Sequence, residues 1–448
     1  MKRSFVSVFS AMAVATAAAT ATIDSQVVRQ QWPWDQKVRI DYRLNCPLDE
    51  TYMVDVSICD AEGNKLNVLS TSLSGDMEDV HCGEHTIVWD PAAAGFADFS
   101  AMACRFTLSP RAPIGPKYLV LDVSQSNRVD AVYTLSALSE APAGGFIKND
   151  VYQKTKIAFR RISAGSYMMG SPSSETGRSD NEDLHKVILT NDFYIAVSEL
   201  TKWQYYHVHT NQNYQYGSVA LSLYPIVSTS WNMVRGTKAD GEDWPNSSAV
   251  GPDSLIGHLR ARTGGDMSLP EGYVFDIPTE AQWEYACRAG TETAWNNGTD
   301  PVYYDTYGNA TYGQADTNTV VGQFSDANLD ILDWYICPNG KWKQGGPCAI
   351  NNSYTCSPNA WGIYSMHGNV MEWTLDAITA GSMASDRLGS ATVTEPRGGG
   401  DDYKIVRGGA WNQKAQNCRS ASRNMCIKRT LANQISVGVR LAIVKEVK

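Results

Sequence analysis

Between residues 26 and 110, short runs of alternating apolar and polar positions are separated by turn residues. The clearest runs cover residues 38–44, 52–58, 85–89 and 104–108. A period of two places every second side chain on the same face, which is typical of half-buried antiparallel strands. The stretch from Asp60 to Asn64 has the composition of a hairpin connection. We therefore predict an all-β sandwich over residues 22–113.

A change of composition marks the end of this region. Residues 110–116 contain three prolines and one glycine, which indicates a boundary. Beyond it, residues 118–122 and 131–135 again alternate as strands do, and residues 141–145 form a second break. Residues 114–150 are therefore a linker or additional strands, and the sequence leaves open which domain they join.

Helices in the remaining chain are indicated by their caps rather than by long periodic runs. Thr279 with Gln282, and Thr201 with Gln204, have the spacing of a capping box, in which each side chain bonds the other residue's backbone. A third helix is predicted to begin at Asp253 or Ser254. Glycine-rich and asparagine-rich stretches separate these helices. The second region is thus expected to be α+β with much irregular structure.

The first residues indicate export. Lys2 and Arg3 precede an apolar run over residues 5–19, and Ala19-Thr20-Ala21 fits a small-residue cleavage site. We predict a signal peptide over residues 1–21 and a periplasmic or extracellular protein. No later stretch approaches the roughly 18 apolar residues that a membrane span requires. The net charge of −9, without any basic run, argues against nucleic acid as a partner.

Cysteines and histidines add little evidence for a metal centre. None of the ten cysteines forms a C-x-x-C pair, which argues against structural zinc and thioredoxin-like chemistry. Cys337, Cys348 and Cys356 lie in a loop-like insertion, where a loop-closing disulfide is the plain interpretation. His207 and His209 are two residues apart on a predicted helix, so they point to different faces.

A dense motif over residues 359–376, N-A-W-G-I-Y-S-M-H-G-N-V-M-E-W-T-L-D, carries most of the remaining information. It resembles the sulfatase-modifying-factor, or formylglycine-generating-enzyme, family. Blocks at residues 164–170, 278–286, 406–411 and 438–442 agree with that family in their order. The resemblance implies that residues 151–448 form a C-type-lectin-like α+β domain. In the first region, residues 83–90 resemble a late strand of immunoglobulin-like modules.

The same resemblance implies a calcium site on the G-N-V-M-E-W loop. Its ligands would be His367, Gly368, Val370 and Glu372, and a calcium ion does prefer the carbonyl and carboxylate oxygens that such a turn can supply. The alternative interpretation is that Glu372 only caps the turn or forms a salt bridge inside it.

Active members of the family bind copper(I) with two cysteines five positions apart, and that pair is not matched here. Gln413 stands near the first position, and Cys418 directly precedes Arg419. Cys426 lies eight residues further on. Under an enzyme interpretation, Cys418 and Cys426 are the catalytic candidates, with Cu+ as their cofactor. A buried thiol or a disulfide is the alternative. The family's four basic positions are predicted to pair with buried acids; they are Arg407, Arg419, Arg423 and Arg440.

Two hypotheses follow. The first is a non-catalytic binding module for a protein or glycan ligand at a cell surface, supported by the missing cysteine pair and by the aromatic residues Trp334, Tyr335 and Trp342. The second is a copper-dependent formylglycine-generating oxidase, whose partner would be a cysteine of a sulfatase polypeptide. A third interpretation, a diversified C-terminal ligand surface as in similar lectin-like variable proteins, stays open.

Overall fold

The computed structural model describes most of the chain, and the residues it describes are 21–30, 36–47, 51–69, 72–96, 104–125, 132–209, 223–264, 269–301, 303–304, 310–311, 329, 347–350, 357–378, 389–400, 402–423 and 425–448. Two compact units are present: the first covers residues 1–67 and 73–113, and the second covers residues 68–72 and 114–448. No helix within the described residues combines the length and the apolar character needed to cross a bilayer.

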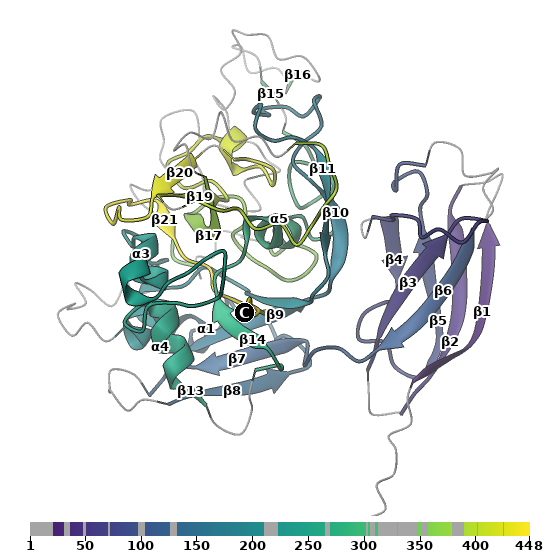
Figure 1. Cartoon of the computed structure of the whole chain (residues 1–448), viewed down its shortest axis with the longest axis horizontal. Helices are drawn as coiled ribbons and strands as arrows, with labels where there is room; N and C mark the ends of the chain where they lie inside the picture. The colour runs from purple at the N-terminus through teal and green to yellow at the C-terminus, as the bar shows by residue number, and fades with distance from the viewer. Residues whose placement is uncertain are drawn as a thin grey trace, which may run out of the picture. The chain divides into compact units, whose positions relative to one another are not determined.

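In the first unit, the regular elements of the described residues are all strands (Figure 1). They are β1 (Thr22–Gln30), β2 (Val38–Asn45), β3 (Met53–Cys59), β4 (Leu73–Gly75), β5 (Gly83–Trp89) and β6 (Arg105–Arg111). One antiparallel sheet has the order β1-β2-β5-β4, and β3 pairs with β6 in a second. Trp89 of the first sheet packs edge-on against Phe106 of the second, with ring centroids 5.6 Å apart. The unit is therefore two packed antiparallel sheets.

The alternating pattern of the sequence follows from this arrangement. In β2, Val38, Ile40, Tyr42 and Leu44 are buried and the residues between them face outward. The runs predicted as strands correspond to β2, β3, β5 and β6, whereas β1 carries no such pattern because most of its residues are exposed. The predicted hairpin is confirmed, since the backbone N–H of Asp60 donates to the carbonyl of Asn64 at 2.9 Å. The immunoglobulin-like topology stays a prediction.

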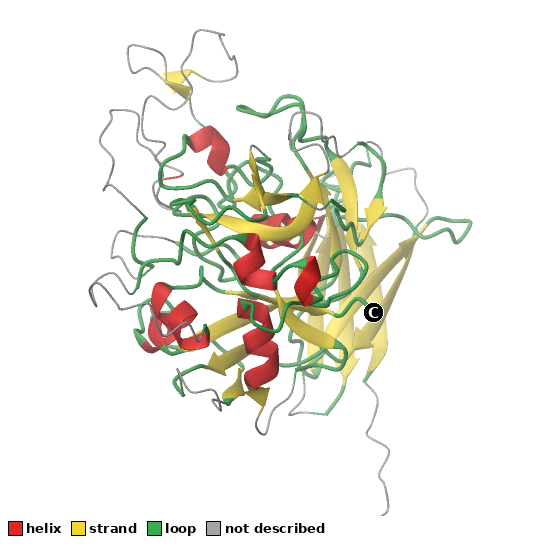
Figure 2. Cartoon of the chain, turned by 60° about the vertical axis from the view of Figure 1, so that its left-hand side comes forward, coloured by secondary structure: helices red, strands yellow, loops and turns green. Residues whose placement is uncertain are grey.

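The second unit mixes strands with short helices, and long loops join them (Figure 2). Its helices are α1 (Val151–Lys154), α2 (Lys202–Val208), α3 (Trp231–Arg235), α4 (Leu255–Arg262) and α5 (Glu280–Arg288), with the 3-10 helices η3 (Lys238–Asp240) and η5 (Ala415–Cys418). The α+β class is confirmed. A C-type-lectin-like arrangement stays a prediction.

Strands of the second unit form several sheets. They are β7 (Tyr118–Asp122), β8 (Tyr133–Leu138), β9 (Lys156–Ile162), β10 (Gly165–Met169), β11 (His185–Leu189), β12 (Phe193–Ala196), β13 (Thr263–Gly264), β14 (Tyr273–Asp276), β15 (Tyr303–Tyr304), β16 (Ala310–Thr311), β17 (Met371–Ile378), β18 (Val393–Thr394), β19 (Tyr403–Arg407), β20 (Met425–Lys428), β21 (Val437–Gly438) and β22 (Ala442–Lys445). The largest sheet has the order β13-β8-β7-β9-β12-β22-β14. Because β7 and β8 belong to it, the strands of residues 114–150 are part of the second unit.

Helix starts in this unit are fixed by the predicted caps. Both sides of the capping box are present at Thr201 with Gln204 and at Thr279 with Gln282. The side chain of Ser254 accepts from the N–H of Gly257, so Ser254 rather than Asp253 caps α4. Ser230 caps α3 in the same way, a helix that the sequence pattern does not indicate because it is only five residues long.

A four-stranded sheet with the order β20-β19-β17-β21 carries the motif residues. Strand β17 is buried along its whole length, and β21 runs parallel to its first residues. The motif loop therefore enters β17 between the C-terminal strands and α5, where the candidate site lies.

Candidate functional site

Backbone geometry at the motif loop depends on two residues in the left-handed region. Ser365 has φ 54° and Asn369 has φ 56°. Asparagine tolerates this conformation well, and the Asn369 side chain also holds a neighbouring segment. Its Oδ1 accepts from the N–H of Cys348 at 2.7 Å, and its Nδ2 donates to Glu199 at 2.7 Å. Glu199 also accepts from the N–H of Val370 at 3.2 Å, so a fully buried carboxylate fixes the start of β17.

The carboxylate of Glu372 forms a buried salt bridge. Nε of Arg440 lies 3.0 and 2.9 Å from its two oxygens, and Nη2 lies 2.7 Å from Oε1. Trp283 donates to Oε2 at 2.6 Å. The Arg440 guanidinium also donates to the carbonyls of Ala196, Tyr364 and Ser365. The Arg440 guanidinium therefore forms hydrogen bonds with the same carboxylate and carbonyl oxygens that would coordinate a metal cation.

This arrangement does not fit a calcium ion at Glu372. Both carboxylate oxygens already accept from two donors, and a divalent cation would have to displace the positive charge of Arg440. The salt-bridge interpretation of Glu372 is the one that the contacts support. Calcium held by His367, Gly368, Val370 and Glu372 stays a prediction, and no step of the proposed function depends on it.

The side chain of His367 holds the segment around Cys418 in place by hydrogen bonding. Its Nδ1 donates to the carbonyl of Cys418 at 2.7 Å, and its Nε2 accepts from the N–H of Asn296 at 3.1 Å. Burial lowers the pKa of His367 to about 4, so the ring is neutral at pH 7. Burial also raises the pKa of the neighbouring Cys287 thiol to about 12, which keeps this free cysteine protonated and unreactive.

Substitution of His367 by glutamine is expected to reduce the loss of unfolding free energy that occurs when the pH is lowered below neutral. The unfolded chain binds a proton at its ordinary pKa of about 6.5, whereas the folded chain binds it only near pH 4, so stability falls as the pH drops through this window. The parent should lose about 2–3 kcal/mol more than the variant between pH ~7.5 and pH ~4.5. Urea titrations at both pH values measure the difference, with the exposed His81 changed to glutamine as the control. Equal pH dependence in parent and His367→Gln would contradict the assignment.

The four arginines predicted to pair with acids do so inside the protein. Arg419 binds both oxygens of Glu182 at 2.8 Å, Arg423 donates to Glu280 at 2.6 Å, and Arg407 donates to Glu284. All four guanidinium groups, including that of Arg440, are at most 1% exposed. Arg407 and Arg423 pair with acids of α5, Arg440 pairs with Glu372 of β17, and Arg419 joins two loops. The prediction of buried pairing is confirmed.

Residues at the copper position are arranged differently from a thiolate pair. The amide Nε2 of Gln413 donates to Sδ of Met371 at 3.3 Å. Cys418 is fully buried with Ala294, Trp295, Leu329 and Ala415, and its Sγ lies 3.7 Å from the carbonyl of Lys414. Cys426, on β20, lies opposite Ile405 of β19 and packs against another cluster that includes Ile378. The structure therefore does not bring Cys418 and Cys426 together.

Some contributing residues could not be found by sequence reasoning. Glu199 is 170 residues before Asn369 and belongs to no motif. Asn296 and Cys287 reach His367 only through the tertiary fold. Other predicted elements lie outside the described residues, namely Trp334, Tyr335, Trp342, Cys337, Cys356 and nearly all of the signal peptide.

The second unit is an α+β domain. Buried ion pairs link its C-terminal arginines to α5 and to the strand of the G-N-V-M-E-W motif, and these features define its class. The chain belongs to the family of the sulfatase-modifying factor enzyme 1-like domain, which matches residues 149–445.

Curated relatives carry one name. The chain is similar to the formylglycine-generating enzymes of Mus musculus (24% identical over 242 residues, 48% of this chain and 57% of the relative), Thermomonospora curvata (28% over 210 residues, 46% and 59%) and Mycobacterium tuberculosis (33% over 101 residues, 22% and 26%). The matched segments thus span between 26% and 59% of these relatives. Among solved structures, PvdO from Pseudomonas aeruginosa is 21% identical, with a TM-score of 0.41 over 64% of this chain and 94% of that one.

Proposed function

We propose that this protein is an exported binding module that uses the family's scaffold without its oxidase chemistry. The observation that carries the proposal is the separation of the two cysteines: Cys418 is buried in one cluster, and the partly buried Cys426 packs against another. Export, to the periplasm or the extracellular space, is part of the proposal because residues 1–21 have the composition of a leader. Family membership alone does not decide between catalysis and binding.

A copper(I) ion prefers soft sulfur ligands, and a two-thiolate site needs both sulfur atoms to be directed at one point. Here the position near the first thiolate holds the amide of Gln413, which donates to the thioether of Met371. Cys418 is enclosed by side chains and directed at a backbone carbonyl. Recruiting Cys418 would require β19 and η5 to separate, because the backbone of Gly409 packs against its sulfur.

The loop between β19 and η5 has the chemistry of a recognition surface. Trp411 is mostly buried and donates to the carbonyl of Ile435 at 3.4 Å, which holds the loop in place. The partly exposed Asn412 and Gln413 follow it, although the Oδ1 atom of Asn412 is itself buried and finds no hydrogen-bond partner among the residues that the structure describes. Amide groups beside an indole suit hydroxyl-rich or peptide ligands. The expected ligand is a protein or a glycan at a cell surface.

A second candidate function is supported by the names of the relatives. A copper-dependent formylglycine-generating oxidase would act on a cysteine of a sulfatase polypeptide, with Cys418 as its active-site thiol and Cys426 as an unusual partner. The relatives named formylglycine-generating enzyme favour this alternative. The contacts of both cysteines favour the binding module.

Copper(I) titration of the reduced, purified protein distinguishes the two functions. The binding module is expected to take up no copper with high affinity at the position of the family's cysteine pair, because Cys418 and Cys426 pack in different clusters. A sulfatase-type cysteine peptide is then added in the presence of oxygen and followed by mass spectrometry. The peptide should keep its sulfur, and a Cys418→Ser variant should behave like the parent.

Tight one-to-one copper binding together with loss of the peptide's sulfur would overturn the binding proposal and establish the oxidase. If neither occurs, the same protein is screened against glycan arrays and cell-surface proteins. In that screen an Asn412→Ala, Gln413→Ala variant provides the matched control for the loop surface.

A further inference from the structure

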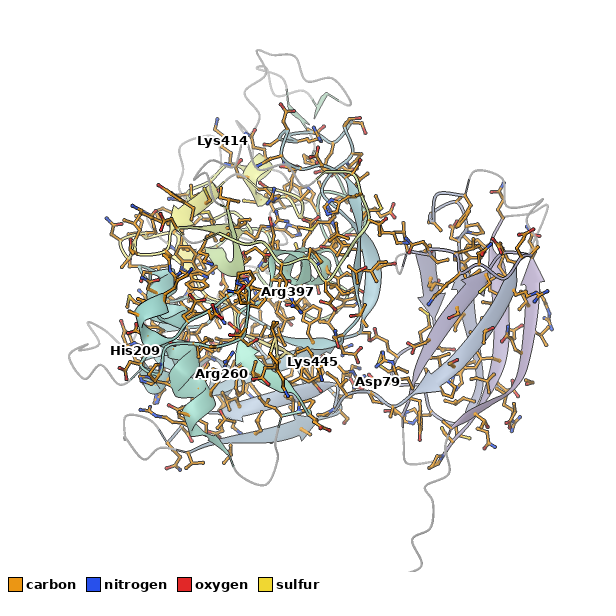
Figure 3. All side chains as sticks on the ribbon, viewed as in Figure 1. Asp79, His209, Arg260, Arg397, Lys414 and Lys445 are labelled. Carbon is orange, nitrogen blue, oxygen red and sulfur yellow. The ribbon has the colours of Figure 1, made fainter. Side chains whose placement is uncertain are left out.

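Two histidines that are distant in sequence meet where α2 ends against α4. His209 is the C-cap residue of α2, and its ring lies 5.5 Å, centroid to centroid, from the ring of His258 on α4. The His209 ring is also stacked on Tyr205, at 5.2 Å and 12° between planes, which fixes its orientation. Figure 3 shows His209 next to α4. Both residues are partly exposed.

The separation of the two rings matches a shared metal ion. An imidazole nitrogen binds zinc at about 2.0–2.1 Å, and the ring centre lies about 1 Å further from the ion. Two imidazoles on one ion, at an angle between tetrahedral and trigonal, therefore have ring centres about 5–5.5 Å apart. The observed 5.5 Å falls within this range, and the planes are inclined by 59° rather than stacked.

Burial favours the neutral form of both rings, which is the form that binds metal ions. Burial lowers the pKa of His209 and of His258, and Arg262 lowers both further. A neutral imidazole offers one nitrogen lone pair for coordination. Nδ1 of His258 is buried and has no hydrogen-bond partner among the described residues, while the same ring makes a backbone hydrogen bond to Val208. Such a bond to the backbone is the usual second contact of a metal-binding histidine.

The surrounding charges set the strength of the site. Asp253, an exposed residue just before α4, favours the charged form of both imidazoles, so its negative charge would also favour a bound cation. No group of three ligands is already in place among the described residues. Arg262 opposes a cation, although its guanidinium is held by the carbonyl of Val208 and the hydroxyl of Tyr133.

We propose that His209 and His258 form a binding site for a divalent transition-metal ion, with zinc as the probe. A bound ion would join the end of α2 to α4. The neighbouring His207 is not part of the site, because its ring packs against Trp203 at 5.6 Å and it lies two positions earlier on the helix.

Zinc titration of full-length, EDTA-treated protein from which any histidine tag has been removed tests the site. One zinc ion per chain is expected, measured by calorimetry near neutral pH. His209→Ala and His258→Ala should each weaken binding at least tenfold, Asp253→Asn should weaken it severalfold, and the control His207→Gln should leave it unchanged. Arg262→Gln should tighten binding severalfold, because it removes the opposing charge.

The Arg262→Gln variant distinguishes a metal site from an effect of misfolding, because a misfolded protein would not bind zinc more tightly. Circular dichroism and melting in EDTA confirm that each variant is folded before titration. Absence of zinc binding in the folded parent, or equal affinity in the parent, His209→Ala and His258→Ala, would overturn the proposal.

Discussion

Replacement of Arg440 by alanine is expected to lower the free energy of unfolding of the second unit by about 3–5 kcal/mol. The substitution leaves the buried carboxylate of Glu372 with one neutral donor, Trp283, in place of a guanidinium. It also leaves the carbonyls of Ala196, Tyr364 and Ser365 without their donor. Chemical denaturation, with the midpoint and slope fitted for the second unit's transition, measures the loss.

The matched control for this prediction is a pair that is exposed. Lys154 and Asp150 approach to 2.8 Å on the surface of α1, and Lys154→Ala should cost no more than about 0.5 kcal/mol. A double variant, Glu372→Leu with Arg440→Met, should regain part of the loss, because no charge is then left buried alone. A cost for Arg440→Ala as small as that for Lys154→Ala would show that the buried pair does not stabilise the fold.

Alanine at Gly409 is expected to cost about 2–5 kcal/mol for two separate reasons. Gly409 has φ +72°, a conformation in which a side chain is strained. A Cβ at this position would also lie 2.5 Å from Sγ of Cys418 and 2.8 Å from the carbonyl oxygen of Asn417, so η5 would have to move. Thermal and urea unfolding of the variant measure the cost.

Gly290, just after α5, is the control that distinguishes backbone strain from steric overlap. Its φ is +92°, and no described atom lies within 4 Å of the position that a Cβ would take, so Gly290→Ala costs only the backbone strain of about 1–2 kcal/mol. The difference between the two alanine variants therefore reports the close packing of Gly409 on Cys418. Equal costs would mean that η5 moves aside without loss, and Cys418 would then be more accessible than the structure indicates.

Local patterns in the sequence are sufficient to predict much of the fold. The alternation in β2 reflects one buried face, and the capping boxes of α2 and α5 need only residues three positions apart. The pairing of the four arginines with acids can also be predicted, because cations inside a domain require partners. These features depend on short-range spacing or on charge balance, which a single sequence displays.

The arrangement of the site depends on contacts that no local pattern records. Glu199 reaches Asn369 across 170 positions, and His209 meets His258 only because α2 packs on α4. Glu372 illustrates the same limit. The motif points to the carboxylate of Glu372, but its partner, Arg440, lies 68 residues later. Which of several possible partners a buried charge takes is decided by tertiary packing.

Strand β22 has a consequence for how this protein is made. It pairs with β12 on one side and with β14 on the other, so residues 442–445 form an interior strand of the largest sheet. Arg440, which binds Glu372, lies two residues before that strand. The second unit therefore cannot complete its sheet until these residues are available, after synthesis and any export, whereas strands β1 to β6 are available much earlier. Synthesis should thus deliver a folded first unit followed by a long unfinished segment, which is open to chaperones and to proteases until its final strand arrives.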